Sequence, residues 1–205
     1  MGEAEKKARG KVTGDPAANL LDAVFALDRA LKKIGVVHML IGGLAVIMRG
    51  APRHTDDVDA TLWAKDSDIK TLLAALDQEG IVGRIPDVEQ FARENAVLLL
   101  LHSETGTPIE ISLAWLPFER EALDRAEELV IRDRKLSVAL PEDLVIYKAA
   151  AWRDKDKLDI QQLLRLYHKN IDLERVRRLI REFAEALEEP ERPDEFERLL
   201  KKTFP

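Results

Sequence analysis

Two aspartates on one predicted strand, Asp57 and Asp59, most constrain what this chain can fold into. Side chains alternate along a strand, so these acids share one face while Val58 and Ala60 share the other. The apolar face must pack on a core, and the two carboxylates, about 7 Å apart at their Cα atoms, can converge on a common cation. The pattern therefore predicts a half-buried strand that carries a candidate Mg²⁺ site.

A glycine pair lies upstream of these acids. Residues 36–41 form a short run rich in branched apolar side chains, which is typical of a buried strand, and Gly42-Gly43 ends it. Residues 44–48 then restart a helical pattern. Glycines let the backbone approach a ligand closely, and free N–H groups at the start of a helix favour phosphate. The segment therefore predicts a strand, a turn and a helix that together face phosphate groups.

Apolar periodicity organises the rest of the chain. Helices are expected over residues 20–34, 67–78, 88–94, 118–125, 142–152, 157–167, 173–187 and 194–202, and further strands over 57–63, 96–102, 108–114, 129–131 and 136–139. The pattern predicts a flexible N-terminus over residues 1–18, a mixed core over 19–140 and a helical region over 141–205. The expected fold class is α/β (α+β), with a small mixed sheet flanked by helices and followed by a C-terminal helical bundle.

Glu110 is the candidate third acid. It lies in the strand predicted over residues 108–114 and points away from the apolar face formed by Ile109 and Ile111. Sites that activate an attacking oxygen and stabilise a leaving phosphate commonly use two metal ions, which need more carboxylates than one pair supplies. We therefore expect this strand to pair beside the strand of Asp57 and Asp59.

Each of these features also has a simpler interpretation. An Asp-x-Asp on a strand is usually a solvated face, a Gly-Gly after a strand is often a tight turn, and Glu110 alone would be a surface residue on an edge strand. Arg49 and Arg53 are expected to be loop charges. His54 is expected to be a surface residue, because no second histidine is spaced to join it as a ligand. The functional interpretation depends on the conjunction and order of the motifs.

Composition restricts the classes of function. The 205 residues, 46% of them hydrophobic, suffice for a core in one domain or two small ones. The net charge of −6 opposes a nucleic-acid partner unless a local basic patch holds it. Without cysteine, the chain has no disulfide, thiolate zinc site or cysteine nucleophile. The longest apolar run, residues 97–101, is too short for a membrane helix, and residues 1–10 lack the apolar core of a secretory signal, so we expect a cytoplasmic protein without a membrane partner.

The central segment resembles the signature of the polymerase-beta-type nucleotidyltransferase superfamily. That signature is a hydrophobic residue, Gly, Gly or Ser, a spacer, and then Asp-hydrophobic-Asp-hydrophobic. Here it reads Ile41-Gly42-Gly43, thirteen residues, and Asp57-Val58-Asp59-Ala60. The intervening Arg53-x-Thr55 resembles the bacterial branch that includes the AbiEii-like and MenT-like toxin nucleotidyltransferases. A helical lysine, Lys148, followed by the Arg-x-x-Asp-x-x-Asp run that begins at Arg153, is similar to a later segment of that branch, so the resemblance covers about residues 20–168.

The resemblance implies a nucleotidyltransferase fold and a role for each matching residue. Catalytic and metal-binding roles fall to Asp57, Asp59 and Glu110, nucleotide-binding roles to Gly42, Gly43, Arg53, Thr55 and Lys148, and supporting roles to Arg153, Asp156 and Asp159. The implied cofactor is Mg²⁺ or Mn²⁺, and Lys148 would contact the triphosphate. By spacing alone, Lys148 is equally an ordinary solvated lysine on an amphipathic helix. Asp156 and Asp159 either orient Lys148 or Arg153, or only cap and solvate the next helix.

The chain departs from the superfamily pattern at two positions. The third acid is Glu110, where Asp is commoner, and Gly43 stands where many active members have Ser. A glutamate is longer and can still reach a metal ion. Because of these two departures, one functional alternative is that the protein is a non-catalytic member of the superfamily kept as a binding or partner module.

The implied reaction is the attack of an acceptor hydroxyl on the α-phosphate of a nucleoside triphosphate, with release of pyrophosphate. Two acceptor classes stay open besides the non-catalytic alternative: RNA, in particular tRNA, within a toxin–antitoxin pair that includes an antitoxin protein, and a small molecule such as an aminoglycoside, or a protein side chain. The basic residues that would meet an RNA backbone are Arg165, Lys169, Arg175, Arg177, Arg178 and Arg181. Interspersed acids such as Glu174 and Glu182 make a solvated helix face the simpler interpretation.

Overall fold

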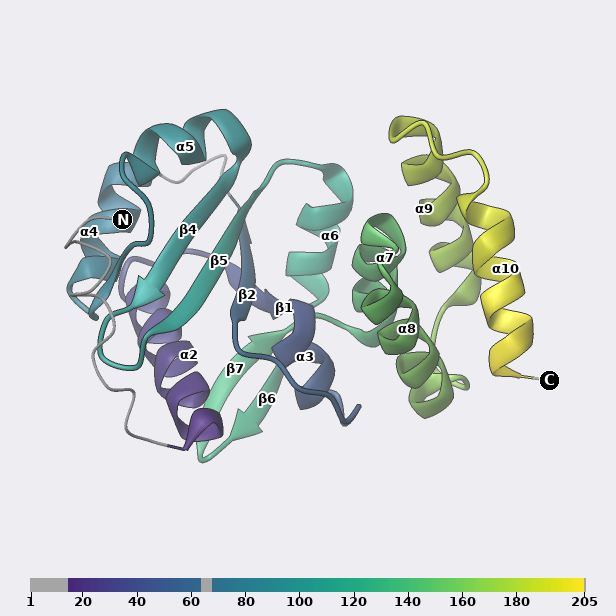
Figure 1. The fold of residues 1–205 in the computed structure, drawn as a ribbon, viewed down its shortest axis with the longest axis horizontal. Helices are drawn as coiled ribbons and strands as arrows, with labels where there is room; N and C mark the ends of the chain where they lie inside the picture. The colour runs from purple at the N-terminus through teal and green to yellow at the C-terminus, as the bar shows by residue number, and fades with distance from the viewer. Residues whose placement is uncertain (1–14, 64–67, 205) are drawn as a thin grey trace, which may run out of the picture.

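The computed structural model describes residues 15–63 and 68–204, which form a mixed sheet followed by C-terminal helices (Figure 1). The strands are β1 (His38–Ile41), β2 (Val58–Trp63), β3 (Ile81–Gly83), β4 (Val97–His102), β5 (Thr107–Ala114), β6 (Glu127–Ile131) and β7 (Arg134–Val138). The helices are α2 (Pro16–Lys33), α3 (Gly42–Met48), α4 (Ile69–Asp77), α5 (Val88–Asn95), α6 (Pro117–Arg125), α7 (Pro141–Ala151), α8 (Asp154–Tyr167), α9 (Leu173–Ala186) and α10 (Arg192–Thr203). The predicted α/β (α+β) class is confirmed.

Helix α2 begins earlier than its apolar pattern predicts. Residues 1–14, most of the segment expected to be flexible, lie outside the described residues, as do 64–67 and 205. Asp15 caps the helix, because its carboxylate accepts a hydrogen bond from the N–H of Ala17 at 3.1 Å, and Pro16 fits the first helical turn. Residues 16–18, which we expected in the flexible N-terminus, therefore form the first turn of α2.

The sheet order places the two acid-bearing strands side by side. The order is β3-β4-β5-β2-β1-β7-β6, in which β2 runs parallel to β5 and antiparallel to β1. In this register Asp59 pairs with Glu110, and on the far side of β5 Glu110 pairs with Leu99 of β4. The prediction that the strand of Glu110 lies beside the strand of Asp59 is confirmed.

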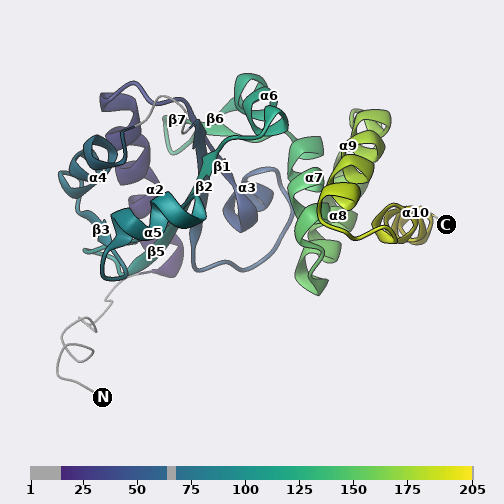
Figure 2. The same cartoon turned by 90° about the horizontal axis from the view of Figure 1, so that it is seen from above.

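Helices cover the two faces of the sheet unequally. Helices α2 and α4 lie on one face, and α3 and α6 lie on the other, with α7 to α10 beyond them (Figure 2). The apolar residues of the central strands, among them Val58, Ala60, Ile109 and Ile111, are fully buried. Because side chains alternate, Asp59 and Glu110 lie on the opposite side of the sheet from this core. The acids therefore face the side that carries α3.

The C-terminal helices are joined to the sheet by Arg49, for which the prediction of a loop charge was wrong. Its buried guanidinium donates to the carbonyls of Val138 at 3.0 Å and Ala139 at 2.9 Å, and to Glu127 at 2.7 Å. Buried carbonyls at the end of β7 need hydrogen-bond donors, and the guanidinium of Arg49 supplies them by lying in the interior. The hydroxyl of Tyr167 donates to the carbonyl of Arg49 at 2.8 Å. Within the described residues, no helix has both the length and the apolarity needed to cross a membrane.

Candidate functional site

Three carboxylates gather on one face of the sheet at the β2–β5 pair. Asp57 immediately precedes β2, Asp59 lies in β2, and Glu110 occupies the paired position in β5. All three are half-buried, whereas Val58 between the two aspartates is fully buried. The alternation that the sequence predicted thus separates an apolar face from an acidic one.

The charges on this acidic face repel one another. Burial, followed by the negative charge of Asp57, raises the pKa of Asp59, and Glu110 adds to this rise. A hydrogen bond from the N–H of Gly43 and the charge of Lys148 lower the pKa but do not cancel the rise. A bound cation would relieve this repulsion.

Gly42 is needed because α3 begins directly against Asp59. The φ angle of Gly42 is +66°, and a Cβ added there would lie 1.8 Å from the Oδ2 atom of Asp59. The N–H of the next residue, Gly43, donates to the same carboxylate. In this structure the Gly43 amide, which the sequence motif assigns to nucleotide phosphates, therefore holds a candidate metal-binding acid.

Replacing Gly42 by alanine is expected to destabilise the fold much more than the same change at Gly35. Both glycines have positive φ angles, +66° and +69°, but an added Cβ at Gly35 meets nothing within 4 Å. Gly35→Ala should therefore cost only the left-handed backbone penalty of about 1–2 kcal/mol, whereas Gly42→Ala adds a clash with Asp59. Urea unfolding of both variants measures the difference, and equal costs would contradict the close approach.

The second glycine is explained by the loop before β2. A Cβ on Gly43 would lie 2.7 Å from the hydroxyl oxygen of Thr55 and 3.0 Å from the guanidinium carbon of Arg53. The Thr55 hydroxyl also donates to Oδ1 of Asp57 at 2.5 Å. These two side chains occupy the space beside residue 43, so a serine there would require Thr55 and Arg53 to shift. The glycine thus lets Thr55 and Arg53 lie close to the start of α3.

Basic side chains from α7, from the start of α8 and from the loop before β2 lie near Asp57 and Asp59. Lys148 of α7 is 6% exposed, and its Nζ lies 3.2 Å from Asp156 and 3.0 Å from Asp159 of α8. Arg53 also pairs with Asp159, at 2.6 Å, and Arg153 pairs with Asp156, at 2.7 Å. The alternative interpretation of Lys148 as a solvated lysine is therefore wrong. Lys148, Arg53, Arg153, Asp156 and Asp159 are called the basic cluster below.

Asp156 has both of the roles left open by the sequence. Its Oδ2 accepts from the backbone N–H of Arg153 at 3.1 Å, which caps α8, while the carboxylate also binds the Arg153 and Lys148 side chains. Burial alone raises the pKa of Asp156, but these hydrogen bonds and charges outweigh burial and the pKa is lowered. Asp57 and Asp59 in turn raise the pKa of Arg153 after its main cause, the bond to Asp156. The acidic face and the basic cluster therefore share one electrostatic environment.

Glu110 does not converge on the two aspartates. Its Oε1 lies 2.7 Å from a guanidinium nitrogen of Arg84, a residue that the motif reading did not identify. Across residues 15–63 and 68–204, no group of three or more His, Asp or Glu side chains forms a ready metal-binding set. The donor chemistry still fits a hard divalent cation, because all three candidates are carboxylates. A bound cation would also compensate their mutual repulsion.

Other predicted features lie outside this centre. His54 is exposed and pairs with exposed Asp56, as expected for a surface residue. On α9, Arg177 pairs with Glu197 at 2.6 Å and Arg178 with Glu182 at 2.9 Å. Arg175 is instead buried and bound to Asp143 and Glu121, so it is a structural residue rather than a solvated one. Three of the six residues of the predicted basic face, Arg175, Arg177 and Arg178, are thus already paired with acids.

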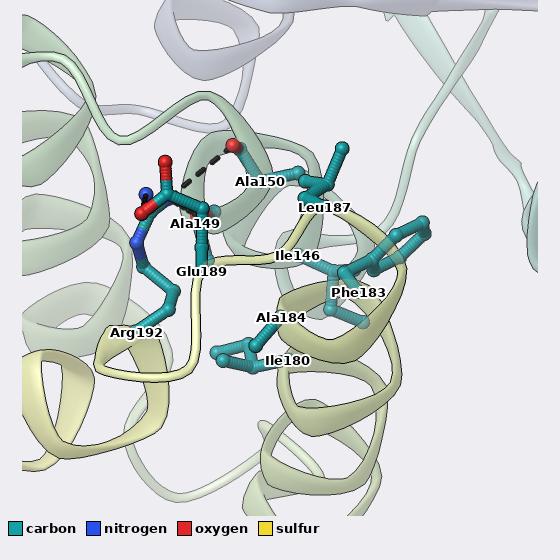
Figure 3. Close-up of a pocket in the computed structure, with 9 residues that line it drawn as sticks. All are labelled: Ile146, Ala149, Ala150, Ile180, Phe183, Ala184, Leu187, Glu189 and Arg192. Carbon is teal, nitrogen blue, oxygen red and sulfur yellow. Dashed lines mark hydrogen bonds and ion pairs between the residues drawn. The ribbon is translucent and has the colours of Figure 1, made fainter.

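A hollow between α7, α9 and the start of α10 is distinct from the acidic face (Figure 3). Its lining is mainly apolar and includes Ile146, Phe183 and Leu187. Arg192 extends along it and donates to the carbonyls of Ala149 at 2.8 Å and Ala150 at 3.3 Å. Because the hollow is too narrow to hold a water molecule, it belongs to helix packing rather than to ligand binding.

Known proteins similar to this chain are nucleotidyltransferases. A family profile described as "Nucleotidyltransferase of unknown function (DUF6036)" matches residues 20–202, and no curated protein matches the chain. Similar solved structures include antibiotic-resistance factor ANT(2'')-Ia, with 16% identity, a TM-score of 0.57, and coverage of 80% of this chain and 91% of that chain. Lincosamide antibiotic adenylyltransferase LnuA with lincomycin bound has 17% identity and a TM-score of 0.50, and the match covers 69% of this chain and 94% of that chain. JHP933 from Helicobacter pylori has 18% identity and a TM-score of 0.52, and the match covers 87% of this chain and 78% of that chain.

These comparisons confirm the predicted nucleotidyltransferase fold. At such low identity the solved structures establish the fold alone, whereas the family profile spans most of the sequence. Assignment to the AbiEii-like and MenT-like branch stays a prediction. The protein belongs to the DUF6036 nucleotidyltransferase family and is a nucleotidyltransferase enzyme.

Proposed function

We propose that this enzyme moves a nucleoside monophosphate from a nucleoside triphosphate to an acceptor hydroxyl, with release of pyrophosphate. The observation that carries the proposal is the paired position of Asp59 and Glu110 beside Asp57, on the sheet face against the start of α3. Carboxylates in this arrangement suit the binding of phosphates through a divalent cation.

Asp57, Asp59 and Glu110 would hold Mg²⁺ or Mn²⁺. When bound, the cation supplies Lewis-acid polarisation of phosphate oxygens and a lowered pKa for the attacking hydroxyl. Two features of the chain orient the aspartates beforehand. The Thr55 hydroxyl donates to Asp57, and the Gly43 amide donates to Asp59. Both carboxylates therefore have a defined direction before the substrate binds.

The basic cluster would receive the triphosphate. Lys148 is fixed between Asp156 and Asp159, so little side-chain freedom is lost when it meets a phosphate. The Arg153 side chain is 61% exposed although its carboxylate partner is buried, which leaves part of its guanidinium able to reach a ligand. Arg53 and Thr55 lie beside the glycine turn and complete the proposed phosphate-facing set with Gly42.

The attacking hydroxyl would belong to the acceptor, and we place a small hydroxylated molecule first among acceptors. ANT(2'')-Ia has been solved in complex with adenylyl-2''-tobramycin, and LnuA with lincomycin. An RNA acceptor such as tRNA, and with it a toxin–antitoxin role and an antitoxin partner, needs a basic surface free to meet phosphates. Arg175, Arg177 and Arg178 are instead paired with acids, so we place RNA second.

The test is incubation with Mg²⁺, each α-labelled nucleoside triphosphate, and separate pools of aminoglycosides and lincosamides, total RNA, and cell protein. We expect the label to appear on a small molecule. Asp57→Ala removes one proposed cation ligand, and Asp56→Ala, a change at an exposed neighbour, is the matched control. Label on RNA alone would move the acceptor to the second class. Absence of label above the Asp57→Ala level in every pool, together with no binding of Mg²⁺ and nucleotide by calorimetry, would favour a non-catalytic binding module.

A further inference from the structure

Arg84 lies in line with the candidate acids across the sheet. Its backbone N–H donates to the carbonyl of Leu99 in β4 at 2.9 Å. Leu99 is paired with Glu110 in β5, and Glu110 is paired with Asp59 in β2. The Arg84 side chain thus crosses β4 to reach Glu110, where its Nη2 lies 2.7 Å from Oε1. An arginine from beyond β3 is placed at the edge of the acidic face.

The Arg84–Glu110 pair is accessible to water and therefore exchangeable. The two side chains are 33% and 43% exposed, and ion pairs of this kind contribute little to stability. A divalent cation on Asp57 and Asp59 would attract the same Glu110 carboxylate and repel the guanidinium. The arginine and the cation therefore compete for one carboxylate.

We propose that Arg84 is a positioning residue that holds Glu110 away from the two aspartates until a divalent cation binds, so that guanidinium and cation are alternative partners of Glu110. This inference rests on the proposed function. It also accounts for glutamate where aspartate is commoner in the superfamily, because one more methylene lets the carboxylate turn between Arg84 on one side and Asp59 on the other. Loss of the arginine should leave Glu110 available to the cation from the start.

Arg84→Gln is expected to tighten Mn²⁺ binding about 3- to 10-fold, because the variant removes both the competing partner and a repelling charge. Mn²⁺ alone is the probe, and the free-ion signal in electron paramagnetic resonance measures its dissociation constant without turnover. The matched control is Arg93→Gln. Arg93 is likewise partly exposed and paired with a glutamate, Glu89, at 2.8 Å, but Glu89 is not among the candidate metal ligands. The control variant should bind Mn²⁺ like the wild type.

A second pair of variants separates competition from a general change of charge. In a Glu110→Gln background, the further change Arg84→Gln should tighten Mn²⁺ binding clearly less than it does with Glu110 present, because it then removes only a repelling charge and no competing partner. An equally large tightening in this background would overturn the inference, as would an unchanged affinity of Arg84→Gln alone. In either case the proposed function stands if the wild type binds Mn²⁺ and Asp57→Ala does not. If the wild type and Arg84→Gln both fail to bind Mn²⁺, the proposed function itself fails and the inference with it.

Discussion

Replacing Asp59 by asparagine is expected to lower the rate of nucleotidyl transfer about 10³-fold or more, because a carboxylate ligand of the proposed cation becomes a neutral amide. Asparagine preserves the shape of the side chain, and its carbonyl oxygen can still accept the hydrogen bond from the Gly43 amide. The fold should therefore be retained while the chemistry is lost. Steady-state rates of label transfer measure the loss.

The same substitution is expected to stabilise the protein in the absence of metal. Burial and the charges of Asp57 and Glu110 raise the pKa of Asp59 above its ordinary value of 3.8. An acid with a raised folded pKa binds more protons in the folded state, so the stability of the wild type falls as the pH rises through the interval between the two values. At pH 7 Asp59 therefore contributes unfavourably to folding, and Asp59→Asn removes that cost. Melting temperatures in a chelator should be higher for the variant at pH 7, with the difference shrinking toward pH 3.8.

Asp56→Asn is the control for both effects. Asp56 carries the same charge three residues away, but its side chain is 79% exposed and pairs with exposed His54. We expect the control to keep the activity and the melting temperature of the wild type. An Asp59→Asn variant that transfers nucleotide at the wild-type rate would remove Asp59 from the chemistry. A variant that is also less stable at pH 7 would contradict the electrostatic account of the acidic face.

Features encoded by local alternation were predictable from the sequence. The Asp-x-Asp strand specifies which face is buried, because a shift of one residue would bury Asp59 and expose Val58. The apolar alternation around Glu110, whose neighbours Ile109 and Ile111 are buried as expected, indicated a strand that could pair beside β2, whereas the parallel direction of that pairing is seen only in the structure. The fold and the position of the acids could therefore be anticipated before any contact was known.

Features that depend on distant contacts were not predictable in the same way. Strand β3 has three residues, too few to show a period, and Arg84 follows it with a partner two strands away. Arg49 is buried by carbonyls of residues 138 and 139, about ninety positions later in the chain. In both cases the local sequence shows only an arginine near a turn. Only the order of strands in the sheet specifies the partner.

Lys148→Met is expected to destabilise the protein by about 2–4 kcal/mol, because it removes a cation from a buried charge cluster. Asp156 and Asp159 are 0% and 2% exposed, so water cannot replace the lost partner. The cost stays below that of a fully orphaned charge, because Arg153 still pairs with Asp156 and Arg53 with Asp159. Lys157→Met is the matched control. Its ion pair with Asp154 is at the surface, and chemical unfolding should show a change within about 0.5 kcal/mol.

A double variant separates the packing role of Lys148 from its proposed role toward the triphosphate. Lys148→Met/Asp156→Asn removes one negative charge together with the positive one, and the asparagine can still accept the capping hydrogen bond from the Arg153 N–H. We expect the double variant to be more stable than Lys148→Met alone. Its KM for the nucleoside triphosphate should stay above the wild-type value, because both variants lack the proposed contact of Lys148 with the triphosphate. If activity returned in step with stability, Lys148 would be a structural residue only. If stability returned without activity, the loss of activity would come from the missing contact between Lys148 and the triphosphate, because the fold that positions Asp57 and Asp59 would be intact.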